Sequence, residues 1–383
     1  MRICLVGVRG DEGHLDGSGG GSERQISLLA RHLASRGNDV TLVVTEYGGQ
    51  DARVDGVTLR AAWNPDKGLR WLRAPMYRFP SLQRVLGSID ADLYYVRGAA
   101  PFSAIVLKTG HRLGSPALLG LASDRDLYPD SGRVLFGLGG SRLHRALGYV
   151  AWLGFQRRAL HLADVVVVQN SEQAAMCVKR GLPHLMIPSI VEEPPDELFS
   201  LSVDYDVVWA GHVCGEARRS KGVDELARLA QALPDVRFAV IGLLTAVAVQ
   251  PAVAKLRLLT NVDLLGPLEY VESQRCIARS RVVVNTSPAE GVSNVMLEGW
   301  ALGKPAVTLT VNPSRLLHHE GLGRCADGDP DVMASLVRTA LRDEMWLSAA
   351  GERARGYVRS IHAANVVCEA YEHLSARASP PSC

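Results

Sequence analysis

The sequence predicts an α/β protein built from two doubly wound domains that face each other across a ligand cleft. Short apolar runs alternate with longer segments of helical period, and this alternation stops once and then restarts. The four consecutive valines at 165–168 are typical of a strand buried on both faces of a parallel sheet. Each domain is therefore expected to hold one mainly parallel sheet covered by helices.

Six strands are expected in each half of the chain. The first set comprises residues 2–8, 39–45, 57–60, 92–96, 117–122 and 164–169. The second set comprises residues 206–210, 236–242, 262–265, 281–285, 305–309 and 323–326. Amphipathic segments such as 23–36 and 143–162 lie between the strands and are expected to be helices.

The break in the pattern predicts the domain boundary. Residues 189–203 follow a proline, contain two more prolines and several acidic residues, and show no period, so they are expected to be a linker. The domains then span 1–188 and 204–360, and 361–383 is expected to be a helix and tail that packs back on the first domain. In such sheets the ligand lies at the carboxyl ends of the strands.

Composition excludes several classes of protein. The chain has 383 residues, 47% of them hydrophobic and 21% charged, which is typical of a globular protein. A net charge of +2 does not favour nucleic acid as a partner. No apolar run is long enough to span a membrane, and the seven scattered cysteines form no C-x-x-C pair. A cytoplasmic protein without disulfides or a zinc site is expected.

The most informative segment is residues 285–305, which read as a strand end, a loop and a helix that begins near Ser293. Glu290 lies in the loop and Glu298 inside the helix. Eight helical steps span about 12 Å, so the two carboxylates are too far apart to share a proton or a metal. They could instead bind the two ends of one elongated ligand, or they could both be ordinary solvated acids.

Backbone amides lie between these two glutamates. The N–H groups of Val292, Ser293 and Asn294 are expected to point out of the helix start, where unpaired donors and the helix dipole attract phosphate. Gly291 lets a ligand approach the backbone closely. A ligand that fits this segment has hydroxyl groups at both ends and a diphosphate between them, which is the layout of a nucleotide sugar.

The same residues resemble a family signature. E-G-x-x-N-x-x-L-E-G-x-A-x-G-x-P, which starts at Glu290, is similar to the motif of retaining, nucleotide-sugar-dependent glycosyltransferases of the large group-one (family 4-like) class. The resemblance implies two Rossmann-like domains in the GT-B fold. It also implies that Glu290 contacts the donor sugar, that Glu298 contacts the ribose hydroxyls, and that the amides of 291–293 contact sugar and phosphate.

Cations for the donor diphosphate are expected after the first strand of the second domain. The family usually has glycine-arginine there and lysine-glycine several residues on; Lys221 and Gly222 match the second pair, whereas His212 stands in the arginine slot. Arg218 or Arg219 would supply the paired guanidinium hydrogen bonds that the missing arginine would make, or His212 would donate a weaker hydrogen bond. The alternative for the two arginines is that they are simply solvated. Lys221 would offset charge as the nucleoside diphosphate leaves.

A glycine-rich loop follows the first strand. Gly20 and Gly21, followed by Ser22 and Glu23, resemble the family's G-G-x-E element, which faces the donor phosphate or the acceptor. The rival interpretation is a dinucleotide fold, since Glu46 ends the second strand. Against it, the loop is too long for the tight strand–helix turn and G-x-G-x-x-G is not completed.

Asp124 is the third candidate catalytic residue, with Glu290 and Lys221. Many relatives carry a histidine near the reacting carbon, but here the strand at 117–122 is followed by Ser-Asp-Arg-Asp. Asp124 lies where chemistry or acceptor contact is expected. The alternative is a structural ion-pair cluster of Asp124, Arg125 and Asp126 at the strand end.

Basic and aromatic residues interleave between 67 and 84. Such a surface could contact anionic lipid at the inner face of the membrane, although Pro75 and Pro80 argue against one continuous amphipathic helix. The alternative is an irregular region that packs its aromatic side chains inward.

The expected activity is transfer of a hexose from a nucleoside diphosphate sugar to a sugar, a lipid-linked or a small-molecule acceptor, without cofactor or obligatory metal. Three rivals stay open. They are an epimerase or phosphorylase on the same fold, a nicotinamide-dependent oxidoreductase, and a silent sugar-binding subunit.

Overall fold

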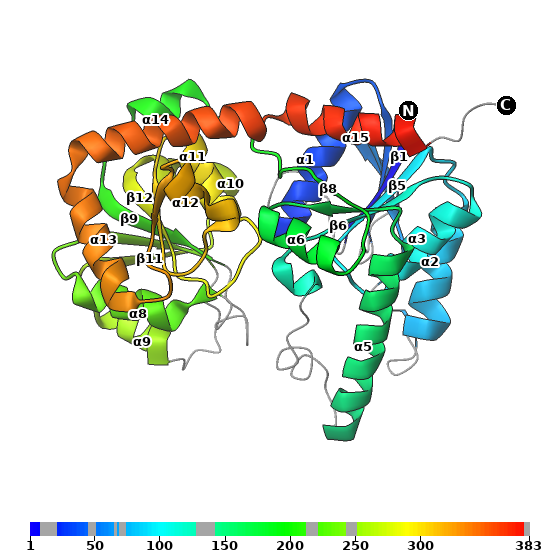
Figure 1. The fold of residues 1–383 in the computed structure, drawn as a ribbon, viewed down its shortest axis with the longest axis horizontal. Helices are drawn as coiled ribbons and strands as arrows, with labels where there is room; N and C mark the ends of the chain where they lie inside the picture. Colours follow the sequence, from blue (N-terminus) through cyan, green and yellow to red (C-terminus); the bar gives the residue numbers. More distant parts are fainter. Residues whose placement is uncertain are drawn as a thin grey trace. The chain divides into compact units, whose positions relative to one another are not determined.

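The computed structural model describes residues 1–7, 21–44, 51–64, 67–68, 74–127, 142–211, 221–242 and 251–378. Two compact units are present: unit 1 runs from Met1 to Ile190 and includes the C-terminal segment from Ala364, and unit 2 is Val191–Ala363. Each unit contains one sheet with helices on both faces (Figure 1). The predicted α/β class with two doubly wound sheets is confirmed.

The sheet of unit 1 has eight strands in the order β3-β4-β2-β1-β5-β6-β7-β8. All neighbours pair in parallel except β3 and β4. The strands are β1 (Arg2–Gly7), β2 (Asp39–Val44), β3 (Ala52–Val54), β4 (Val57–Ala61), β5 (Leu93–Arg97), β6 (Ala117–Gly120), β7 (Val165–Val168) and β8 (His184–Met186). The three-residue strands β3 and β8, which lie at the two edges of this sheet, were not expected from the sequence.

Helices cover both faces of this sheet. On one face α1 (Gly21–Ser35) and α15 (Ala364–Ala378) share a core cluster with Leu93 and Tyr95. On the other face α2 (Phe79–Gly87), α3 (Ser103–Arg112), α5 (Arg142–Leu162) and α6 (Ser171–Lys179) share a cluster with Tyr94 and Val96. Successive residues of β5 thus alternate between two hydrophobic cores, as a sheet buried on both sides requires.

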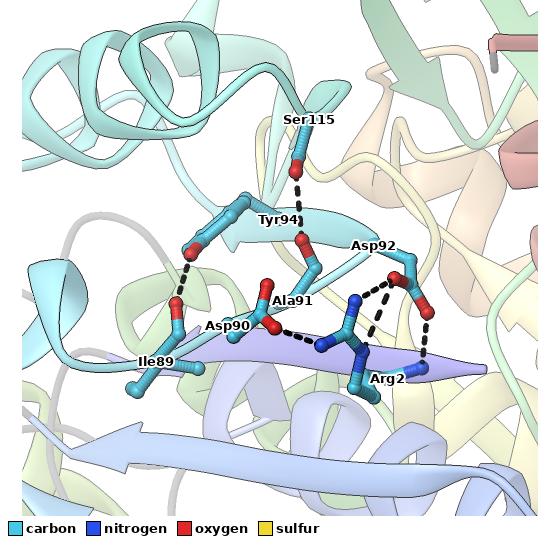
Figure 2. A network of polar contacts seen from close by, with 7 residues as sticks. All are labelled: Arg2, Ile89, Asp90, Ala91, Asp92, Tyr94 and Ser115. Atoms are coloured by element: carbon cyan, nitrogen blue, oxygen red, sulfur yellow. Dashed lines mark hydrogen bonds and ion pairs between the residues drawn. The ribbon is translucent and has the colours of Figure 1, made fainter.

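The amino edge of the same sheet is held by a polar network (Figure 2). The backbone N–H of Arg2 donates to Asp92 at 2.8 Å, and its guanidinium contacts the carboxylates of Asp90 and Asp92. The Arg2 hydrogen bonds keep the pKa of Asp92 below its usual value. The network joins β1 to the start of β5. Because it lies at the amino edge of the sheet, it leaves the carboxyl edge for ligands.

The sheet of unit 2 has six strands in the order β11-β10-β9-β12-β13-β14, and every neighbouring pair is parallel. The strands are β9 (Tyr205–Ala210), β10 (Phe238–Ile241), β11 (Val262–Gly266), β12 (Ser280–Asn285), β13 (Ala306–Thr308) and β14 (Gly323–Cys325). The twelve strands expected from the sequence in the two units are present, with ends within two residues of those expected where the structure describes them.

Two layers of helices also cover the sheet of unit 2. The helices α8 (Val223–Ala232), α9 (Pro251–Leu258) and α13 (Pro330–Arg342) share a cluster with Trp209 on one face. On the other face α10 (Tyr270–Ala278) and α11 (Asn294–Ala301) pack against the sheet, and α14 (Glu344–Ile361) and α12 (Leu316–His319) lie beside α11. A Cβ at Gly299 would come within 2.4 Å of Val283, so this glycine allows α11 to lie directly on β12.

The segment at 67–84 is described only in part, because residues 69–73 lie outside the described residues. A π-helical turn at Ala74–Arg78 leads directly into α2, so both prolines lie in one helical run. Tyr77 and Phe79 pack against the core of unit 1, which favours the inward-packing interpretation for these two rings. None of the described helices is both long and apolar enough to cross a bilayer.

Candidate functional site

A partly buried ion pair lies at the carboxyl edge of the unit 2 sheet. The Lys221 Nζ, at the start of the segment that leads into α8, donates to Glu290 Oε1 at 2.6 Å. The Ser287 Oγ donates to the same oxygen at 2.6 Å. The Glu290 side chain is only 13% exposed, and that of Lys221 is 32% exposed. The pair is thus withdrawn from bulk water but reachable from the edge of the sheet.

The electrostatics of this pair keep Glu290 ionised. Burial by itself would raise the pKa of Glu290. The charge of Lys221 and the hydrogen bonds from Lys221, Ser287 and Ser293 outweigh that effect, and the pKa lies below its usual value. At neutral pH the site therefore presents a carboxylate and an ammonium side by side.

Two hydrogen bonds and one glycine position Lys221. The Trp209 Nε1 donates to Thr286 Oγ1 at 3.0 Å, and the Thr286 hydroxyl donates to the backbone carbonyl of Lys221 at 2.9 Å. Gly222 has φ of +63°, and a Cβ at this position would lie 1.8 Å from the Thr286 carbonyl oxygen. Only glycine fits here, because the turn touches the loop that follows β12. The loops after β9 and β12 are therefore in direct contact.

Helix α11 begins beside Glu290. Ser293 is its N-cap residue, with extended backbone, and forms no side-chain cap within the described chain. Its hydroxyl instead bonds to Glu290. Gly291 and Ser293 are buried, and Asn294 is half-buried. The start of the helix is thus packed tightly against the carboxylate, and Glu298 lies half-buried about one turn further along α11.

The structure brings together part of the predicted constellation. Lys221 and Ser293 both contact Glu290, and the chain continues from Glu290 through Gly291 and Val292 into the helix. Gly21 and Asp124 belong to unit 1. The predicted donor-binding residues Gly20, His212, Arg218 and Arg219 lie outside the described residues.

Asp124 lies in a short 3₁₀ turn, Asp124–Asp126, after β6. Its carboxylate accepts a hydrogen bond from Gln173 Nε2 at 2.8 Å, and burial raises its pKa. The neighbouring Asp126 carboxylate accepts from the backbone N–H groups of Ala99 and Ala122 at 3.1 and 2.6 Å. These contacts give both carboxylates a structural role at the strand end, and they are hydrogen bonds, whereas the alternative predicted ion pairs.

Sequence reasoning missed three residues of the unit 2 site: Trp209, Thr286 and Ser287. Ser287 could have been suspected, since a hydroxyl three residues before a predicted loop carboxylate can reach it. Trp209 and Thr286 carry no such local signal, because 77 positions separate them. No group of three or more metal-binding side chains gathers in the part of the chain that the structure describes.

The arrangement suits binding of a ligand that carries both hydroxyl and phosphate groups. An ionised carboxylate accepts hydrogen bonds from hydroxyls, and a lysine ammonium is a compact charge that binds phosphate oxygens. Both side chains are held in position before any ligand arrives, which reduces the entropy lost on binding.

Two family models match the chain. One described as group 1 glycosyl transferases matches residues 205–343, and one described as glycosyltransferase family 4 matches residues 19–190. Together the two matches cover most of both units. No curated protein matches the sequence well enough to count as a relative.

Solved structures resemble the whole chain. Sucrose-phosphate synthase from Thermosynechococcus elongatus has a TM-score of 0.70 at 16% identity over 98% of both chains. WaaG, a glycosyltransferase involved in lipopolysaccharide biosynthesis, has 0.70 at 16% over 97% of this chain and 99% of its own. HepE of Anabaena in complex with UDP has 0.66 at 15% over 98% and 100%. These likenesses show a shared fold, the GT-B fold.

Proposed function

Because this chain belongs to the group 1, family 4 glycosyltransferases, we propose that it moves a hexose from a nucleoside diphosphate sugar to an acceptor with retention of anomeric configuration. The observation that carries the proposal is the contact between Lys221 and Glu290 beside the start of α11. It supplies a charge for phosphate and an acceptor for sugar hydroxyls within one site of unit 2.

Each residue has a proposed role. Glu290 accepts hydrogen bonds from the donor sugar, and Lys221, held beside Glu290, binds the diphosphate and offsets the negative charge that develops as the diphosphate leaves. Glu298, further along α11, accepts from the ribose hydroxyls. Retention then follows from attack on the face from which the diphosphate departs, and no protein nucleophile is required.

The nucleotide to test first is uridine diphosphate. The structure of HepE, which shares the fold over the whole chain, is described as a complex with UDP. A ribose held by a carboxylate and a diphosphate held at a helix start are common to all nucleoside diphosphates. The base is therefore best identified by comparing UDP with the diphosphates of the other bases.

The test is a thermal-shift and calorimetric titration with UDP, GDP, ADP and their hexose conjugates. A ligand that binds only the folded state raises the melting temperature. We expect one nucleoside diphosphate to bind, Glu298→Ala to weaken it, and the exposed Glu352→Ala on α14 to leave it unchanged. Proton NMR of the product then reports the anomeric configuration. Absence of binding by all of them, or equal binding in both variants, would reject the donor site.

A further inference from the structure

Arg97 is the last residue of β5 and lies at the carboxyl edge of the unit 1 sheet. Side chains alternate along a strand, so Arg97 shares a face with Leu93 and Tyr95, the face covered by α1 and α15. Its partner across the β5–β6 ladder is Gly120. The neighbouring position on β6 therefore supplies no side chain to pair with the guanidinium.

The guanidinium of Arg97 has no close partner among the described residues. Arg97 forms neither a hydrogen bond nor an ion pair there, although its Nε is buried. A buried donor left without a partner costs free energy. Arginines elsewhere in this unit do find partners: Arg2 contacts two aspartates and Arg36 contacts Glu372 at 2.7 Å.

A negative charge near Arg97, the carboxylate of Asp126, is already satisfied. Burial raises the pKa of Asp126, and the nearby charge of Arg97 opposes that rise. The Asp126 carboxylate, however, accepts hydrogen bonds from the backbone N–H groups of Ala99, Ala122 and Ser123 at 3.1, 2.6 and 3.2 Å. These backbone hydrogen bonds occupy both carboxylate oxygens of Asp126, to which the guanidinium of Arg97 would otherwise donate. The N–H groups of Arg97 are thus left for a group that the described part of the chain does not supply.

The surroundings hold Arg97 at an edge where ligands bind. Tyr371 of α15 packs edge-on against Tyr95 with ring centroids 5.4 Å apart. Burial raises the pKa of Tyr371 well above its usual value, and the nearby charge of Arg97 opposes that rise. Gln25, in the second turn of α1, exchanges two hydrogen bonds with the backbone of Ile190, which follows β8. Helix α1 therefore begins at this same carboxyl edge.

We propose that Arg97 binds an oxyanion, a phosphate or a carboxylate, on the acceptor, so that this enzyme glycosylates an acidic acceptor. A planar guanidinium matches both groups with two parallel hydrogen bonds. The assignment to the acceptor rests on the proposed function, in which unit 2 holds the donor. The anion site itself rests only on the geometry around Arg97.

The test uses the full chain and inorganic phosphate as the probe, with acetate as a second oxyanion and chloride as the reference at equal ionic strength. Melting temperatures are measured with and without saturating UDP for the wild type, Arg97→Ala, Arg97→Lys and a control, Arg53→Ala. Arg53 is an exposed cation of the same unit, on β3. UDP affinity is measured separately by calorimetry for each variant.

We expect phosphate or acetate to stabilise the wild type and the Arg53 variant, with UDP present as well as absent. Arg97→Ala should weaken this oxyanion binding about 10- to 100-fold, with Arg97→Lys between, and should leave UDP affinity unchanged. If phosphate and acetate raised the melting temperatures of all variants equally, the proposed oxyanion site at Arg97 would be rejected. Loss of the oxyanion effect in the presence of UDP, or loss of UDP affinity in Arg97→Ala, would assign Arg97 to the donor and overturn the acceptor proposal. Failure of the wild type to bind UDP would reject the proposed function. The phosphate measurements without UDP would still test whether Arg97 binds an oxyanion.

Discussion

The ammonium of Lys221 donates a 2.6 Å hydrogen bond to the carboxylate of Glu290, although 69 positions separate the two residues. The contact joins the loop after β9 to the loop after β12, two strands that pair directly in the sheet. It also makes the two charges dependent on each other, because each is the other's neutralising partner in a partly buried place. Their properties can therefore be tested by changing one residue at a time.

Removal of the ammonium should slow the chemical step. Lys221→Met keeps the length of the side chain but supplies no charge to the departing diphosphate, so we expect kcat to fall about 100- to 1000-fold. The release of nucleoside diphosphate from the donor measures this rate. Lys255→Met removes an exposed lysine of α9 in the same unit and serves as the control. Equal rates in the two variants would show that Lys221 does not act on the leaving group.

Glu290 should make stability depend on pH in the acid range. Its pKa in the folded protein lies below the ordinary value of 4.5, so its contacts stabilise the fold above that value and this contribution is lost as the pH falls through the lower, folded-state pKa. Glu290→Gln should lower the free energy of unfolding by about 1.5–3 kcal/mol at neutral pH. The difference from the wild type should shrink on acidification from about pH 6 to about pH 3.

Urea unfolding at several pH values measures this difference. Glu352→Gln, at an exposed position of α14, controls for the loss of one carboxylate. A difference for Glu290→Gln that stays constant down to the lowest pH would mean that ionisation of Glu290 contributes nothing to the fold.

Two glycines with similar backbone angles should respond differently to alanine. Gly222 and Gly266 have φ of +63° and +71°, but a Cβ meets the Thr286 carbonyl oxygen at 1.8 Å in the first and meets nothing within 4 Å in the second. Gly266→Ala should cost only the backbone strain, about 1–2 kcal/mol. Gly222→Ala should cost more and should also weaken UDP binding, since the turn that carries Lys221 must shift. Matching losses of stability would mean that the loops are not tightly packed.

The indole hydrogen bond can be tested with two buried tryptophans. Trp209 Nε1 donates to Thr286, whereas Trp300 Nε1 has no partner among the described residues. Both side chains are at most 2% exposed. Replacement of each by phenylalanine leaves a similar cavity, so Trp209→Phe should be less stable than Trp300→Phe by about 1 kcal/mol, the value of one hydrogen bond. Thermal unfolding of the two variants would contradict the role of Trp209 if Trp300→Phe were equally or more destabilised.

The amino-acid sequence by itself determined the strands, the helices between them and the break that separates the two sets. These depend on local periodicity and turn residues, so even the ends of β1, β12 and α11 could be placed to within about two residues. The spacing of Glu290 and Glu298 could also be predicted from the sequence, because both belong to one continuous loop and helix. The short edge strands β3 and β8 were not among the strands expected.

Only the tertiary structure decided which distant residues meet. In the sheet of unit 2, β9 lies between β10, the next strand in the chain, and β12, which comes two strands later, and its pairing with β12 brings Lys221 to Glu290. The same holds for Trp209 with Thr286. Arg97 illustrates the converse: its lack of a partner depends on Gly120 beside it and on the amides that satisfy Asp126. Such contacts follow from long-range packing, which no local pattern of residues encodes.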